Sequence, residues 1–285
     1  MPAERIAENL AFINWTVLAG LAVGSFAAVV LGRLRTDATR GYLGFTAFCS
    51  SLLAWLAVLS DDALPKSAGA SLIKSAGASL IGDVGWDEVR RTALVVLAAL
   101  AIAYVVAIGR GRRAPVLGLS GLGAGVIALG AGAMAWGGSA LGSIALFVQL
   151  VLLAVATGGV LASMILGHWY LVTPKLGEGP LILFSRILTW TVGLQLLLFV
   201  VAIGLGLGPA GSAGFGALTG SWALFVWLRL MVGIVFPLVA SWAAIQTART
   251  RSMESATGLL YISVGTIASG TILASGLYFG AGLLV

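Results

Sequence analysis

Long apolar runs, separated by short charged segments, are the feature that most constrains the fold of this chain. Most stretches between charge clusters are apolar over about 18–20 residues, the length that a helix needs to cross the ~30 Å hydrocarbon core of a membrane. Only 9% of the residues are charged and 60% are hydrophobic, whereas about 25% are charged in soluble domains. The sequence therefore predicts an all-α, polytopic integral membrane protein.

We expect eight membrane-spanning helices, which form a single transmembrane domain over residues 1–285. The expected spans are, approximately, residues 12–32, 42–60, 92–109, 115–136, 143–173, 181–207, 220–247 and 256–282. Residues 61–91 form the longest connection, which contains a tandem duplication of KSAGASLI at 66–73 and 74–81. We interpret the duplication either as an insertion that an exposed loop tolerates or as a short helix against the membrane interface or a partner chain.

Basic residues are concentrated in every second connection between the expected spans. They are Arg33, Arg35, Arg40, Arg110, Arg112, Arg113, Lys175, Arg249 and Arg251. The connections GGSALG and GPAGSAGFGALTG, in contrast, carry no charge. Only residues 61–91 break the contrast, because their basic residues are offset by acidic ones: Lys66, Lys74, Arg90 and Arg91 against Asp61, Asp62, Asp83, Asp87 and Glu88. Because basic loops stay in the cytoplasm, we expect both termini and residues 61–91 on the extracytoplasmic side of a cell inner membrane. The same distribution explains the basic pI without any nucleic-acid partner.

Two pairs of segments suggest an internal repeat. FAAVVLGR (26–33) and ASMILGH (162–168) both close an apolar run with Leu-Gly and a basic residue, and the fourth and eighth spans are both rich in glycine. Four spans in each half would make the repeats parallel, related by an axis along the membrane normal. The alternative is a chance match between apolar segments of low complexity.

Three expected spans contain pairs of glycines four residues apart, which place a groove on one helix face. The pairs are Gly20 with Gly24, Gly121 with Gly125, and Gly276 with Gly280. We interpret them as packing sites inside the bundle, in preference to a dimer interface.

Polar residues near the cytoplasmic ends of the fifth and sixth spans form a predicted inner layer of His168, Tyr170, Lys175 and Arg186. His168 lies six residues before Pro174, and Arg186 lies six residues after Pro180. At 1.5 Å per residue, both lie about 9 Å from the cytoplasmic ends of their spans. One interpretation is an interfacial anchor, since Trp, Tyr and Lys side chains favour the headgroup region. The other is a quinone-binding or lipid-binding site, because ionisable groups in a membrane are often functional.

A predicted outer polar layer comprises Arg229, Gln149 and Gln195, which lie at comparable depth in the seventh, fifth and sixth spans. Asn14 and either Asp61 or Asp62, near the rim, are candidate partners of this layer. Structurally, Arg229 could instead bond backbone carbonyls freed by a kink in its own span. Functionally, it could bind an anionic or quinone-like group that enters from outside.

The sequence argues against several kinds of chemistry. No Asp or Glu lies within an expected span, although proton-coupled carriers and pumps rely on such buried carboxylates. His168 is the only histidine and Cys49 the only cysteine, and a haem held by His168 alone would lack the paired histidine of two-haem cytochromes. With no carboxylate in a span, a metal site made by side chains is disfavoured still more. GLGAG (121–125) lies inside a span, outside the strand-to-helix context of a phosphate loop.

These observations favour a non-catalytic membrane subunit of a larger redox or respiratory complex, in which basic residues hold a quinone or a lipid. We expect membrane lipids and other protein subunits as partners, no covalently bound cofactor, and no catalytic activity of the isolated chain. A transporter or flippase for a small anionic or neutral molecule is the alternative, with Arg186 and Arg229 at opposite ends of its path. A purely structural membrane scaffold is the third hypothesis.

Overall fold

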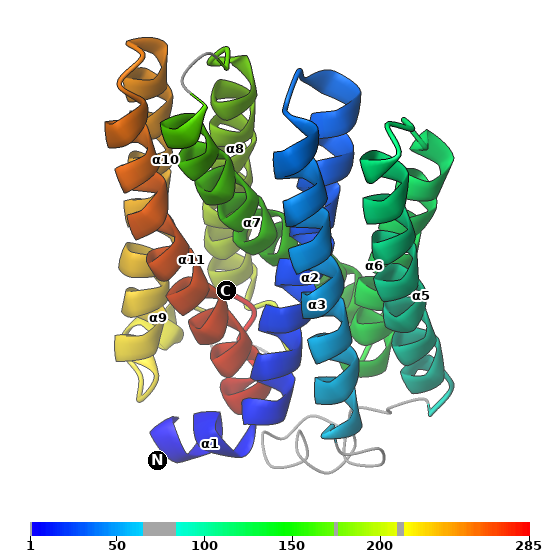
Figure 1. The fold of residues 1–285 in the computed structure, drawn as a ribbon. Coiled ribbons are helices and arrows are strands. Elements are labelled where there is room, and N and C mark those ends of the chain that lie inside the picture. Colours follow the sequence, from blue (N-terminus) through cyan, green and yellow to red (C-terminus); the bar gives the residue numbers. More distant parts are fainter. Residues whose placement is uncertain (1, 65–83, 174–175, 210–213) are drawn as a thin grey trace.

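The computed structural model describes residues 2–64, 84–173, 176–209 and 214–285, and these are helical without any strand. Within these described ranges, eight helices are long and apolar enough to span a membrane, which confirms the predicted number and the all-α class. Their order along the chain is a simple succession of antiparallel spans (Figure 1). The chain is thus a multi-pass membrane protein.

Seven of the spans are continuous α-helices. They are α2 (Leu10–Arg35), α3 (Arg40–Asp62), α5 (Val84–Gly109), α6 (Pro115–Trp136), α7 (Ala140–Val172), α8 (Gly179–Leu205) and α11 (Met253–Ala281). The remaining span consists of α9 (Ala223–Leu230), a π-helical turn η3 (Met231–Val235) and α10 (Phe236–Arg249). Two short elements, α1 (Pro2–Glu8) and the 3₁₀ helix η2 (Gly214–Leu218), lie outside the spans.

The third span begins earlier than the sequence indicated. Residues 84–91, which we assigned to the connection, are the first turns of α5. Charged residues are accommodated there because Arg90 and Arg91 pair with Asp61 and Asp62 at the end of α3. The duplicated KSAGASLI segments lie outside the described residues.

The ends of the helices follow local sequence signals. The side chains of Thr39 and Ser139 accept hydrogen bonds from the first turns of α3 and α7, as N-cap residues do. At the other ends, Gly206 (φ 63°) and Gly282 (φ 68°) terminate α8 and α11 in the left-handed conformation, which glycine adopts without steric cost.

The helices form two groups of four. In the first group, α2, α3, α5 and α6 pack in succession and α6 closes back on α2. In the second group, α7, α8, the α9–α10 span and α11 pack in the same cyclic order, and α11 closes on α7. The groups meet along α2 and α7, which cross near the middle of the bundle (Figure 1) and are flanked by contacts of α6 with α7 and of α11 with α2.

Small residues allow α2 and α7 to cross at backbone contact. A Cβ atom on Gly24 would overlap the carbonyl oxygen of Ala154, and one on Gly158 would overlap the backbone nitrogen of Ser25. Nearby, the Tyr42 hydroxyl of α3 donates a hydrogen bond of 3.1 Å to the Ala162 carbonyl of α7. This crossing joins the two groups of helices.

The other predicted glycine pairs also pack within the chain. Gly121 and Gly125 of α6 contact Phe26 and Val23 of α2, respectively. Gly276 lies against Ile6 and Ile13, and Gly280 lies against Trp222 and the backbone of Arg5. These contacts confirm the interpretation of the three pairs as packing sites inside the bundle.

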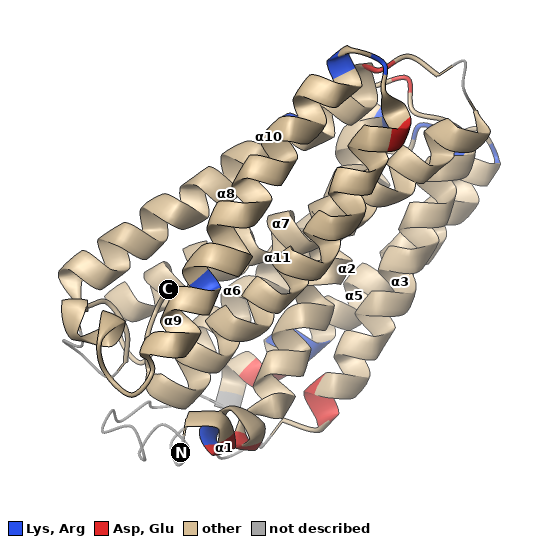
Figure 2. Cartoon of the chain, turned by 90° about the vertical axis from the view of Figure 1, so that its left-hand side faces the viewer, with Lys and Arg blue, Asp and Glu red and all other residues tan. Residues whose placement is uncertain are grey.

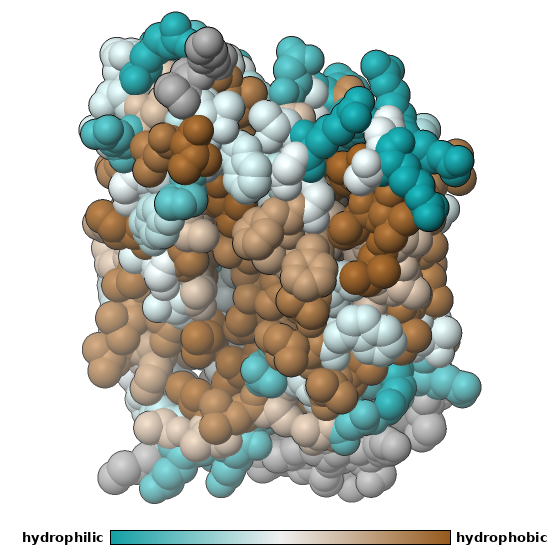
Figure 3. Space-filling model, viewed as in Figure 1, coloured by the Kyte–Doolittle hydropathy of each residue, from teal (hydrophilic) through white to brown (hydrophobic). Residues whose placement is uncertain are grey.

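The outside of the bundle is apolar around its middle and polar at its ends. Most charged residues lie at the two ends of the helices (Figure 2), and hydrophobic side chains cover the middle of the face in Figure 3. Large apolar side chains such as Trp190, Leu205 and Val116 are at least 72% exposed, which suits contact with lipid chains rather than water.

The α2–α7 crossing predicts a position-specific effect of a single side chain. Gly158→Val should destabilise the protein by about 1–3 kcal/mol or more, because the added atoms overlap α2 and packed interiors resist expansion. Gly159→Val is the matched control, since nothing lies within 4 Å of a Cβ at this neighbouring position of the same helix. Thermal unfolding in detergent should show a lower midpoint for Gly158→Val only; equal midpoints would contradict the close crossing.

Candidate functional site

Arg229 is buried inside the second group of helices, with only 2% of its surface exposed. Its Nη2 donates a hydrogen bond of 3.0 Å to Oε1 of Gln195 in α8. Its Nη1 donates one of 3.2 Å to the carbonyl of Gly233. The Nε–H group has no partner among the described residues, so the guanidinium is held by neutral groups and one donor is unused.

The π-helical turn and two glycines make space for this guanidinium. Gly233 of η3 and Gly270 of α11 face each other so closely that a Cβ on Gly233 would stand 2.5 Å from the Cα of Gly270. A Cβ on either glycine would also stand 3.0 Å from Nη1 of Arg229. The Gly233 carbonyl that accepts from the arginine lies within the π-helical turn η3, and such turns occur frequently at functional sites.

Gln195 connects the arginine to the centre of the bundle. Its Nε2 donates a hydrogen bond of 3.0 Å to the Leu152 carbonyl of α7. The two side chains therefore link α9, α8 and α7 by one chain of hydrogen bonds. Gln149, the third residue of the predicted outer layer, is not in this chain, because its Nε2 donates to the Val285 carbonyl at 2.9 Å and its buried Oε1 has no partner among the described residues.

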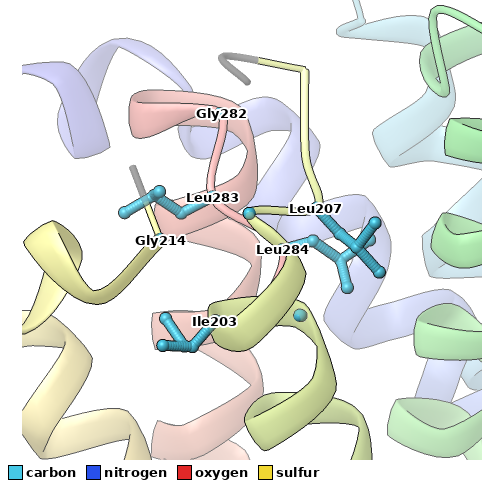
Figure 4. A pocket seen from close by; sticks show the side chains of 8 residues that line it. Ile203, Leu207, Gly214, Gly282, Leu283 and Leu284 are labelled. Atoms are coloured by element: carbon cyan, nitrogen blue, oxygen red, sulfur yellow. The ribbon is translucent and has the colours of Figure 1, made fainter. Parts of the chain in front are cut away.

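A small cavity of about 10 Å³ lies beyond this layer, between the end of α8 and the last residues of the chain (Figure 4). It is lined by Ala202, Ile203, Gly206, Leu207, Gly214, Gly282, Leu283 and Leu284. Ala202 is two helical turns beyond Gln195, or about 10 Å along α8 at 1.5 Å per residue. The cavity is thus separate from the guanidinium of Arg229, and it is bordered by η2 and by the segment after α11.

The residues of the predicted inner layer do not form one buried cluster. His168 and Arg186 are exposed, because the buried faces of α7 and α8 pass through other residues of the same turns, such as Leu166 and Ser185. Neither has a hydrogen bond or ion pair within the described part of the chain. Tyr170 is buried and donates its hydroxyl to the Gly177 carbonyl. Lys175 lies outside the described residues.

A larger open cavity, of about 570 Å³, lies beside Tyr170 at the same end of the bundle. Its lining includes Arg251, Ser252 and Glu254 from the turn before α11 and its first residues. Arg251 also pairs with Glu178 at 3.3 Å, and the two side chains are 66% and 39% exposed. The ring of Trp169, the residue before Tyr170, packs against Gly41 of α3.

The sequence analysis missed a second buried arginine, Arg90, which is 2% exposed in the first group of helices. Its Nε donates to Oδ1 of Asp61 at 2.6 Å, and its Nη1 donates to Oδ1 of Asp87 at 2.6 Å. Its guanidinium carbon lies 4.7 Å from the ring centroid of Trp136 and 5.6 Å from that of Trp15, distances that suit cation–π contacts. The signal in the sequence was the three-residue spacing of Asp87 and Arg90, which indicates a helical ion pair.

This cluster also corrects the expected partners of Arg229. Asp61 binds Arg90, and Asp62 forms an exposed pair with Arg91. Arg229 forms no ion pair with a described residue and bonds to Gln195 and to a backbone carbonyl instead. The structural alternative for Arg229, a bond to a carbonyl freed in its own span, is therefore observed.

Within the described residues no group of three or more His, Cys, Asp and Glu side chains could hold a metal ion. The groups around Arg229 are hydrogen-bond donors and amide or carbonyl oxygens, which can bind and orient an acceptor but offer no nucleophile. Comparison of the chain with protein-family models, curated proteins and solved structures finds no match.

The two ion pairs at the end of α3 predict different costs for neighbouring substitutions. Asp61→Asn should destabilise the protein by an amount near the lower end of about 3–5 kcal/mol, because it leaves a buried arginine with one carboxylate. Asp62→Asn, in a pair whose side chains are 41% and 44% exposed, should cost about 0–1 kcal/mol. Thermal unfolding of both variants checks this, and an equal or reversed order would contradict the assigned burial.

Proposed function

We propose that this chain is a non-catalytic integral membrane subunit of a larger membrane complex, and that it holds a quinone or a lipid at Arg229. The observation that carries the proposal is a fully buried guanidinium whose described partners are neutral, with its Nε–H group unpaired. A buried charge without a counter-charge is costly, and ionisable groups inside membranes are by default functional candidates.

The chemistry of the site supports a binding role. Arg229 stays protonated and offers donors only, and the Gln195 amide is neutral, so neither can act as a general acid or base near neutral pH. A ligand with an acceptor oxygen would satisfy the unpaired Nε–H group, while its apolar part stays in the hydrocarbon. Electron transfer or release of the ligand then belongs to partner subunits of a redox or respiratory complex.

The orientation of this subunit follows from the charges of the connections. The arginine-bearing connections would be cytoplasmic by the positive-inside rule, in a cell inner membrane. Both termini would be extracytoplasmic, and Arg229, six residues after Ala223 at the start of α9, would lie closer to the outer side.

The two groups of helices would be the halves of a parallel four-plus-four repeat. Two features support this: their cyclic packing order is the same, and the flanking contacts, α6 with α7 and α11 with α2, exchange when the halves are exchanged. The intervals in the sequence agree, because 135 residues separate Arg33 from His168, Asn14 from Gln149, and Ser60 from Gln195. A repeat about an axis normal to the membrane has these properties.

Retention of native ligands by arginine variants tests the proposal. The protein is extracted gently from its own membranes, and its bound quinones and lipids are quantified by mass spectrometry after organic extraction. Arg229→Gln should lose about 90% or more of a bound species, because the loss of a charged hydrogen bond, worth about 1.5–3 kcal/mol, corresponds to a tenfold or larger change in affinity. Arg186→Gln, an exposed arginine of α8, is the matched control and should retain it.

Arg229→Lys keeps the charge and reports on folding separately from binding. Full retention by Arg229→Gln would contradict the site. Loss in Arg186→Gln alone would instead support the predicted inner layer of His168, Tyr170, Lys175 and Arg186 as the binding site. A chain that is stable without partners and releases a substrate across the membrane would support the transporter in place of the subunit.

A further inference from the structure

The two buried arginines occupy corresponding places in the two groups of helices. Arg90 lies near the N-terminal end of the described part of α5, and Arg229 lies six residues after Ala223, where α9 begins. Each of these helices opens the third span of its group. Both arginines are 2% exposed, and each contacts the second span of its own group through Asp61 or Gln195.

The partners from the second span differ in charge. Asp61 of α3 is a carboxylate, whereas Gln195 of α8 is a neutral amide that stands 135 residues after Ser60, the neighbour of Asp61. Three residues before the arginines, Asp87 in the first group corresponds to Val226 in the second, and Val226 is fully buried. The first arginine is therefore neutralised inside the chain by two carboxylates, and the second meets none among the described residues.

The difference extends to a single atom. In the first group, the Nε–H of Arg90 is the donor that binds Oδ1 of Asp61, at 2.6 Å. In the second group, the Nε–H of Arg229 is the donor left without a partner, while Nη1 and Nη2 are both used. The Nε–H group, which has no hydrogen-bond partner in Arg229, is thus the group that donates to a carboxylate oxygen in Arg90.

From this comparison we propose that the ligand at Arg229 is an amphiphile with a singly charged carboxylate headgroup, which binds Nε where the first group uses its own Asp61. The inference rests on the proposed function and selects a fatty-acid-like anion in place of a neutral quinone. One negative charge compensates the one buried positive charge. Binding at Nε also leaves the hydrogen bonds to Gln195 and Gly233 in place.

The surroundings of the site include the small cavity of Figure 4, which is bordered by Gly214 of η2 and by Gly282 after α11 and lies about two helical turns along α8 from Gln195. The apolar chain of the ligand remains beside the exposed side chains of α9, such as Leu224 and Trp227.

Ligand-dependent thermal stability distinguishes the headgroups. The purified protein in dodecyl maltoside is titrated with oleate, with oleyl alcohol of the same chain length, with dioleoyl phosphatidylglycerol, and with ubiquinone. Oleate should raise the unfolding midpoint of the wild type and of Arg186→Gln but not that of Arg229→Gln, because ligands that bind only the folded state stabilise it. Oleyl alcohol should have no effect.

Gln195→Glu provides a second test that does not depend on Arg229→Gln folding. This change installs in α8 the carboxylate that Asp61 supplies in α3. It should raise the unfolding midpoint of the ligand-free protein and abolish the further shift by oleate. In an Arg229→Gln background the same change should lower the midpoint, because the new carboxylate is then buried without a cation.

The outcomes separate this inference from the proposed function. If ubiquinone shifts the midpoint through Arg229 and oleate does not, the carboxylate assignment is overturned and the ligand-binding subunit stands. A shift by phosphatidylglycerol without one by oleate likewise overturns the carboxylate. If no amphiphile shifts the midpoint and Gln195→Glu does not stabilise the protein, both proposals fail.

Discussion

The contact between Gly24 and Gly158 determines the arrangement of the whole bundle. Helices in a membrane gain little from hydrophobic association, so their packing depends on close backbone approach and on polar contacts. At this crossing α2 and α7 approach without intervening side chains. Each of these two helices belongs to its own group, together with three further helices. The hydrogen bond from Tyr42 to the Ala162 carbonyl fixes the same boundary from α3.

Near α1, at one end of the bundle, aromatic side chains form the contact between the two groups of helices, in place of the glycines at the crossing. Phe12 of α2, Trp136 of α6 and Phe279 of α11 contact one another with ring centroids 4.8–5.5 Å apart, the range of favourable aromatic pairs. Arg90 lies over the Trp136 ring and joins this cluster to α5. At this end, the first group of helices is held by aromatic packing and contains Arg90, which is paired with carboxylates. The second group contains Arg229, which has no ion pair with a described residue. The asymmetry between otherwise similar groups is what points to a ligand.

The sequence predicted the number and order of the spans well, because length and hydropathy determine what crosses a membrane. It misplaced the start of α5, since Asp87, Arg90 and Arg91 read as a polar connection until pairing with α3 is known. The depth of Arg229 and Gln195 was predictable from the helical rise, but their hydrogen bond needs the tertiary packing of α8 against the seventh span. His168 and Arg186 share a depth, yet rise alone does not specify the face of a helix, and both side chains face outward. The π-helical turn had no signal in the sequence beyond the nearby glycine and proline.

The most direct test of the central claim is native mass spectrometry of the protein released gently from its own membranes. Our account predicts that the chain leaves the membrane with other protein subunits and with one bound amphiphile per chain, whose mass disappears in Arg229→Gln. A solitary chain or homo-oligomer without a retained small molecule would contradict it, and Arg229 would then be a structural residue that bonds its own backbone and Gln195.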